Sequence, residues 1–135
     1  MQTAPETIST SRGSLWAGRI LSGLAVLFLL FDAVIKILKM PFAVDATVQL
    51  GYPGSLVLTI GIIELICTLL YVIPSTSILG VVLLTGYLGG AVATHLRHGD
   101  PLFSHVLFPT YIGALLWGGL LLREARLRSL FPFRR

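Results

Sequence analysis

The sequence predicts an all-α membrane protein, a bundle of four transmembrane helices with a short interfacial helix between spans one and two. Hydrophobic residues make up 55 % of its 135 residues, charged residues only 12 %, and the mean hydropathy is +0.88. A soluble domain usually carries about a quarter charged residues. The shortage of polar residues is explained if most of the surface faces lipid, and the length suffices for one domain.

Four apolar segments approach the roughly 20 residues that a helix needs to cross a bilayer. They are predicted at residues 16–37, 55–73, 78–96 and 106–122. A polar tail (1–14) precedes the four-helix domain (15–130), and a basic tail (131–135) follows it. The first apolar run is too long for a signal peptide and has no small-residue cleavage site after it, so we expect it to be retained as a span.

Turn signals separate these segments. The four residues Pro74 to Ser77 force an antiparallel helical hairpin, in which proline ends one helix and a hydroxyl residue can cap the next. Between the first two spans, Pro41 suits a first helical position and Gly51 the residue past a helix end. This pattern predicts a short helix lying in the membrane interface, with an ordered loop as the alternative.

The positive charges predict the orientation. With four spans, both tails and the second loop share one side, which carries seven arginines, whereas the other side carries Lys36, Lys39 and Arg97. Cationic segments tend to stay in the cytoplasm. We therefore expect a multi-pass protein of the cytoplasmic (inner) membrane with both termini cytoplasmic. The seven arginines are Arg12, Arg19, Arg123, Arg126, Arg128, Arg134 and Arg135.

Composition narrows the partners. The net charge is +4, and the cationic residues lie beside apolar segments. We therefore expect the protein to interact with the lipid bilayer and not with nucleic acid. Cys67 is the only cysteine, which excludes disulfide-relay chemistry within one chain. Small residues in the last two spans, among them Gly86, Gly89, Gly90, Gly118 and Gly119, predict close helix packing.

Three ionisable residues lie inside predicted spans, where a charge costs at least about 2.5 kcal/mol. Asp32 and Lys36 are four residues apart and share a helix face, either as a neutralising ion pair or facing a cavity. Glu64 lies near the midplane on a stripe with Gly61, Thr68 and Tyr71. It is expected to be paired across helices or protonated, as part of an interior site or as structural hydrogen bonding.

The histidines His95, His98 and His105 fall within eleven residues at the predicted outer face. No HExxH or matched ExxH pair accompanies them, so no metal site is assigned; capping or lining a polar mouth is the commoner role. Depth alone places several of these residues in the outer half of the bundle. They are hypothesised to converge on one polar pocket, open outward and formed by Asp32, Lys36, Glu64, His95, Arg97, His105 and Tyr111.

Several segments together resemble the DoxX-like family of small bacterial membrane proteins, over roughly residues 14–132. The resemblance implies a four-helix membrane bundle. The family's name comes from a subunit linked to thiosulfate:quinone oxidoreduction, and other members are associated with membrane redox complexes. The similar segments are Gly51-Tyr52-Pro53 through Gly61-Ile62-Ile63-Glu64-Leu65, Leu84 through His95, Phe108-Pro109, Trp117-Gly118-Gly119-Leu120 and Arg126-Leu127-Arg128.

Three functions are compatible with these features. The resemblance favours a redox-accessory or quinone- or small-apolar-ligand-binding subunit, in which Glu64, His95 and Tyr111 hydrogen-bond a quinone and a membrane or soluble redox protein is the partner. A carrier for a small solute or for protons would use Asp32, Glu64 and Lys36, and predicts a homo-oligomer or a cavity reachable from both sides. A non-catalytic scaffold is the third. Whether the chain is an enzyme is left open.

Overall fold

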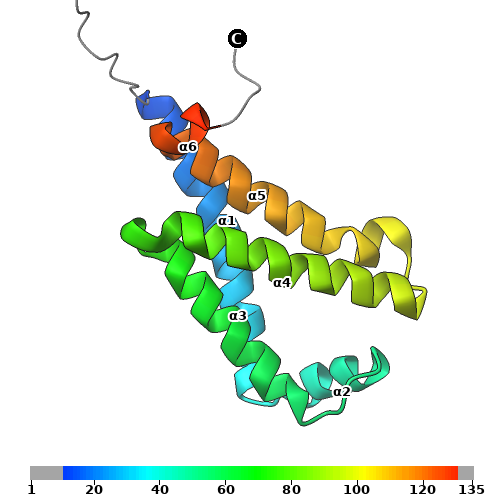
Figure 1. Cartoon of the computed structure of the whole chain (residues 1–135). Helices are drawn as coiled ribbons and strands as arrows, with labels where there is room; N and C mark the ends of the chain where they lie inside the picture. The colour runs from blue at the N-terminus through cyan, green and yellow to red at the C-terminus, as the bar shows by residue number, and fades with distance from the viewer. Residues whose placement is uncertain (1–10, 131–135) are drawn as a thin grey trace, which may run out of the picture.

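The computed structural model describes residues 11–130 and consists of helices (Figure 1). Within that range there is no strand, and the predicted all-α fold is confirmed, including the short helix between the first two spans. Residues 1–10 and 131–135 of the predicted tails lie outside the described residues, and the first helix begins inside the predicted N-terminal tail. The elements are α1 (Arg12–Ile37), α2 (Pro41–Gln49), α3 (Leu56–Val72), a 3-10 turn (Pro74–Thr76), α4 (Ser77–His98), a π-helical turn (Leu102–Val106), α5 (Phe108–Arg123) and α6 (Ala125–Ser129).

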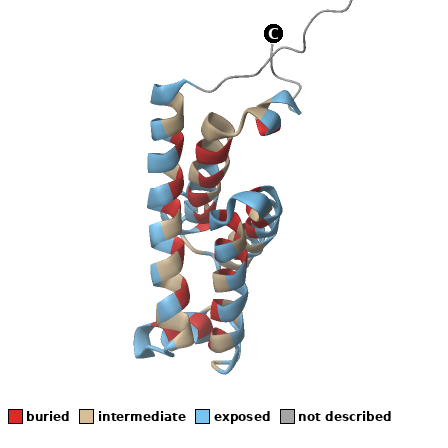
Figure 2. Ribbon diagram, turned by 90° about the vertical axis from the view of Figure 1, so that its left-hand side faces the viewer, coloured by how far each residue is buried: buried red, intermediate tan, exposed pale blue. Residues whose placement is uncertain are grey.

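Helix length and hydropathy support a membrane bundle. Three segments of the described chain are long and apolar enough to cross a membrane: Arg12–Ile37, Pro74–His98 and Leu102–Arg123. The fourth, α3, is apolar but has only 17 residues, or about 26 Å. The buried residues of each long helix line up on the side that faces the other helices (Figure 2), while large apolar side chains such as Leu27 and Phe31 stay exposed.

The four long helices are arranged so that each has two neighbours. α1 packs against α3 and α5, and α4 packs against the same two helices. The start of α1 and the end of α5 lie together at one end of the molecule, beside α6 (Figure 1), where Ser14 Oγ donates a hydrogen bond to the carbonyl of Leu122 at 2.7 Å. From their connecting turn, α3 and α4 diverge, and α2 lies at the open side of this wedge (Figure 1).

The turn between α3 and α4 confirms the predicted hairpin, but its hydroxyl groups act differently from the expectation. Thr76 and Ser77 do not cap the start of α4; they donate to the carbonyls of Leu70 and Tyr71 at 2.7 and 2.8 Å. The last carbonyls of a helix lack helical partners, which explains why they attract these donors. At the same corner, Gly80 lies so close to the backbone of Tyr71 that a Cβ there would overlap it.

The predicted packing glycines divide into two groups. Gly119 meets α1 backbone to backbone: a Cβ there would lie 2.8 Å from the carbonyl oxygen of Gly18. Gly86, Gly89 and Gly90 are exposed, and a Cβ at any of them would meet no atom within 4 Å. The prediction that these three glycines mediate close packing is therefore wrong, because no atom of a neighbouring helix lies close to them.

A buried chain of hydrogen bonds ties α1, α3 and α5 together near the end that carries the termini. Arg123 Nε donates to Ser22 Oγ at 3.2 Å, and Ser22 Oγ lies 2.7 Å from the hydroxyl of Tyr71. That hydroxyl donates to the carbonyl of Leu116 at 2.7 Å, so Ser22 is the donor to Tyr71. This chain closes the interior of the bundle at the end opposite to α2.

Candidate functional site

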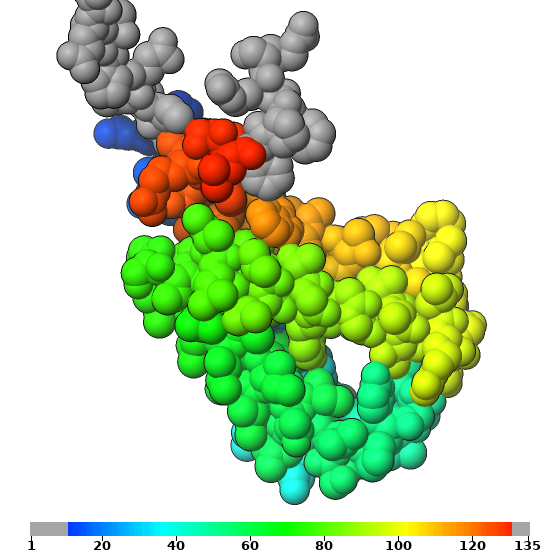
Figure 3. Space-filling view, in the orientation of Figure 1, coloured from blue at the N-terminus to red at the C-terminus, as the bar shows by residue number. Residues whose placement is uncertain are grey.

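A cavity of about 540 Å³ fills the wedge between α3 and α4. Residues from α1, α2, α3, α4 and α5 line it, and most of them are apolar, such as Leu29, Ile60 and Ile112. The space-filling view shows a gap between α2 and the C-terminal half of α4 (Figure 3), and residues on both sides of that gap line the cavity. The opening therefore lies at the side of the bundle, between helices.

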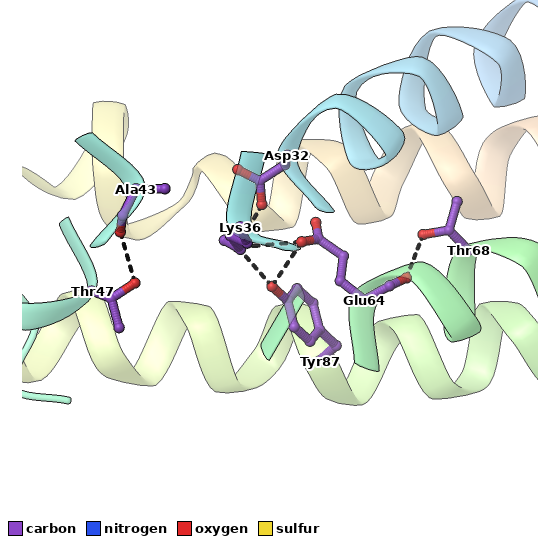
Figure 4. A network of polar contacts seen from close by, with 7 residues as sticks. All are labelled: Asp32, Lys36, Ala43, Thr47, Glu64, Thr68 and Tyr87. Carbon is purple, nitrogen blue, oxygen red and sulfur yellow. Dashed lines mark hydrogen bonds and ion pairs between the residues drawn. The ribbon is translucent and has the colours of Figure 1, made fainter. Parts of the chain in front are cut away.

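Lys36 organises the polar part of this cavity. Its Nζ donates to Asp32 Oδ2 at 2.5 Å, to Glu64 Oε1 at 3.2 Å and to the hydroxyl of Tyr87 at 2.9 Å (Figure 4). The Tyr87 hydroxyl in turn donates to Glu64 Oε1 at 3.2 Å. An ammonium group has three protons to donate. The four side chains therefore form a network in which Lys36 has no proton left for a further acceptor.

The local sequence explains how α1 and α3 bring these groups together. Asp32 and Lys36 are one turn apart on α1, which lets the ammonium reach both the carboxyl group of its own helix and that of Glu64 on α3. Gly61 allows the close approach, because a Cβ there would lie 2.8 Å from Lys36 Cβ. The predicted inward stripe is confirmed, since Gly61, Glu64, Thr68 and Tyr71 are all buried.

The carboxyl groups of Asp32 and Glu64 lie within hydrogen-bonding distance of each other. Within residues 11–130, Asp32 Oδ1 and Glu64 Oε2 accept no hydrogen bond from a nitrogen or a hydroxyl group. Every fully shielded side-chain oxygen and nitrogen of the described residues has a partner, so these two oxygens must be accessible, and both residues line the cavity. Glu64 is nevertheless only 1 % exposed. Two carboxyl groups thus share one ammonium at the cavity wall.

Polar side chains also cluster at the opening. The hydroxyls of Tyr52 and Thr94 lie 2.8 Å apart, and because Thr94 donates to the carbonyl of Gly90, Tyr52 is the donor between them. This hydrogen bond links the segment after α2 to α4.

At the end of α4, one carboxyl group holds two histidines. Asp100 lies 2.6 Å from Nδ1 of His95 and 2.6 Å from Nδ1 of His98. These hydrogen bonds, the one from His95 first, hold the pKa of the Asp100 carboxyl below its ordinary value of 3.8. The arrangement explains the histidine cluster of the sequence as an end cap of α4; among the described residues, no three ligands are placed to hold a metal ion.

The structure brings together four of the seven predicted pocket residues. Asp32, Lys36, Glu64 and His95 line the cavity. The other three are exposed and lie outside its lining: the ring of His105 stands edge-on to that of His95 at 6.2 Å, the hydroxyl of Tyr111 donates to the carbonyl of Phe103, and Arg97 lies near Gly51.

Four cavity residues with polar side chains are absent from the predicted pocket, namely Thr47, Tyr52, Tyr87 and Thr94. Tyr87 carried a usable signal, because it is the only tyrosine within the third predicted span. Tyr52 and Thr94 carried none, since their pairing depends on how far apart α2 and α4 stand.

The described helices define a small integral membrane protein whose four-helix bundle holds a cavity with ionisable groups in its wall. The family model of the DoxX-like family matches residues 20–119, and the chain belongs to this family. The sequence-based expectation of that membership is confirmed. Neither the curated proteins nor the solved structures that were compared with the chain gave a match.

Proposed function

We propose that this DoxX-like protein binds a small, mainly apolar molecule in the cavity beside α3 and α4, as the ligand-binding or redox-accessory subunit of a membrane system. The cavity itself is the observation that carries the proposal. Its volume of about 540 Å³ falls in the range of small-molecule sites, roughly 300–1,000 Å³, which are mostly apolar with a few placed polar groups. A site of this composition favours an apolar body with one polar end.

The lateral opening supports entry from the lipid phase. The gap between α2 and the C-terminal half of α4 (Figure 3) lies between helices that a bilayer would surround. An apolar molecule dissolved among the acyl chains could then reach the cavity without crossing water. The arginines favour an orientation in which both termini lie on the cytoplasmic side of the inner membrane. In that orientation the cavity would lie in the outer half of the membrane.

A quinone is the first ligand class to test, because it is apolar, lives in the bilayer and agrees with the redox associations of the family. Its carbonyl oxygens need hydrogen-bond donors. The nearest donors, Lys36 and Tyr87, already donate to Asp32 and Glu64. A quinone would therefore bind there only by replacing one of these acceptors.

Binding is favoured over permeation because the gap that leads to the cavity lies between helices, at the side of the bundle. A carrier needs access from both sides of the membrane, and the chain of hydrogen bonds from Arg123 through Ser22 and Tyr71 to Leu116 fills the other end. The polar network also argues against a purely structural scaffold, since two carboxyl groups that share one ammonium line the cavity.

Two glycines of α4 provide the test. Gly90 lines the cavity, whereas Gly86, one turn earlier, does not, and a Cβ at either position meets no atom within 4 Å. Gly90→Leu should fill the cavity without disturbing the helices, and Gly86→Leu is the matched control. Both proteins and the wild type would be isolated in polymer-bounded native membrane discs, and their co-purifying quinones and other small molecules quantified by mass spectrometry.

The expected result is a molecule enriched with the wild type and with Gly86→Leu and reduced at least tenfold with Gly90→Leu. Equal amounts with all three proteins would refute the proposal. The same conclusion would follow if nothing co-purified and an added short-chain quinone bound all three proteins no better than it bound protein-free discs.

A further inference from the structure

We propose that the cavity selects organic cations, molecules that join an apolar body to a quaternary or protonated amine. This inference rests on the proposed function, because it names the ligand class of the same cavity. It follows from the charges, the hydrogen-bonding groups and the aromatic rings of the cavity wall.

The charged groups of the wall favour a positive ligand. α1 contributes Asp32 and Lys36, and α3 contributes Glu64; Tyr87 and His95 of α4 and Tyr52 are the remaining titratable lining residues, while α2 and α5 supply none. His95 is paired with Asp100. The two carboxyl groups therefore exceed the single ammonium by one negative charge, which an empty cavity must offset with a proton or a small cation. A bound organic cation would take that place.

The hydrogen-bonding groups point the same way. All three protons of Lys36 are used within the network, the Tyr87 hydroxyl donates to Glu64, and Tyr52 donates to Thr94. What remains toward the cavity are the carboxyl groups of Asp32 and Glu64, which lie within hydrogen-bonding distance of each other. A wall with acceptors to spare and its donors engaged complements a cation better than it complements an anion or a carbonyl.

Aromatic rings complete the match. A cation is attracted to the face of an aromatic ring, and cages of such rings recognise quaternary amines. The rings of Phe28 and Phe108 contact each other edge to face at 5.2 Å, and both line the cavity. Phe42 and Tyr52 approach from the α2 side. The ring of Tyr87 already has a cation beside it, since the ammonium of Lys36 lies 5.6 Å from its ring centre.

Two probes that differ only in charge test this preference. Benzyltrimethylammonium and neopentylbenzene have the same shape, with a cationic nitrogen in one and a neutral carbon in the other. Their binding would be measured by equilibrium dialysis against protein in lipid nanodiscs, with protein-free nanodiscs as the blank that corrects for partition into lipid. The variants are Asp32→Asn and Glu64→Gln, with Asp45→Asn as control, because Asp45 is exposed on α2 and does not line the cavity.

We expect the wild type and Asp45→Asn to bind the cation at least tenfold more tightly than its neutral isostere. The preference should fall about tenfold in Asp32→Asn and in Glu64→Gln. Because Asp32 is 27 % exposed, Asp32→Asn provides the test if Glu64→Gln does not fold with wild-type helix content. Equal binding of the two probes, lost in Gly90→Leu, would overturn the cation preference and leave the proposed function standing. Binding of neither probe above the blank would overturn the inference, and the proposed function falls with it only if the co-purification test also fails.

Discussion

Replacing Gly119 by alanine would put a methyl group into the contact between α1 and α5. The added carbon would lie 2.8 Å from both the carbonyl oxygen of Gly18 and the backbone nitrogen of Ser22, and it would overlap the Ser22 hydroxyl. Backbone atoms cannot rotate away, so the two helices must separate. The neighbouring Gly118 offers a matched control, because a Cβ there would lie 3.7 Å from Leu21 Cδ1, an ordinary contact.

The expected magnitude follows from two terms. Alanine is favoured over glycine in a helix interior by about 0.8–1 kcal/mol, and this gain applies equally to both positions of α5. Forcing an extra carbon into a packed interface costs about 1–3 kcal/mol, and this term applies only at Gly119. The propensity term cancels in the comparison, so Gly119→Ala should be less stable than Gly118→Ala by about 1–3 kcal/mol.

The free energy of unfolding would be measured in mixed micelles, following the loss of helical circular dichroism as sodium dodecyl sulfate is added. Gly118→Ala should be as stable as the wild type or slightly more stable. If Gly119→Ala proved as stable as Gly118→Ala, the backbone contact between α1 and α5 would not be present in the folded protein, and the account of the bundle given above would be wrong.

Two further perturbations address the polar clusters. Lys36→Met leaves Asp32 and Glu64 without their common partner, and removing one side of a buried ion pair costs roughly 3–5 kcal/mol. The same unfolding assay should show this loss of stability. The triple variant that adds Asp32→Asn and Glu64→Gln should recover most of the lost stability. At the end of α4, the lowered pKa of Asp100 means that its contacts with His95 and His98 stabilise the fold above its ordinary pKa of 3.8 and are lost as the pH falls through the lowered value. The protection factors of the amides around this carboxylate, which correct for the slower intrinsic exchange in acid, should therefore fall on acidification in the wild type and be low at every pH in Asp100→Asn; identical protection in the two proteins at neutral pH would contradict this reading.

Hydropathy and turn residues were sufficient to predict the helices. Pro41 and Gly51 marked the ends of α2, and Gly51 does adopt the left-handed conformation expected past a helix end, with φ 95°. The stripe of Gly61, Glu64, Thr68 and Tyr71 was readable because the helical period places small and polar residues on one face. The helix that begins at Arg12 starts earlier than predicted, because charge alone does not end a helix at the membrane surface.

The candidate site was less accessible from the sequence, for a geometrical reason. Depth in the membrane can be counted along each helix, and the three residues that it placed together, Asp32, Glu64 and His95, all line the cavity. The direction in which each side chain points across the bundle depends on helix rotation, which the sequence constrains only where a stripe is clear. Arg97 and Tyr111 have the right depth but lie on exposed surfaces.

The corner where Gly80 meets Tyr71 gives the cavity a mechanical property. α3 and α4 leave this corner as two stiff helices, and the ten helical steps from Gly80 to Gly90 span about 15 Å. Any side chain at position 80 would push α3 and α4 apart at the corner. A small rotation of the helices about this corner would produce a larger displacement at the far end of α4, where one hydrogen bond between Tyr52 and Thr94 bridges the gap. The width of the gap between α2 and α4 thus depends on Gly80, which lies at the other end of α4 from the residues that line the gap.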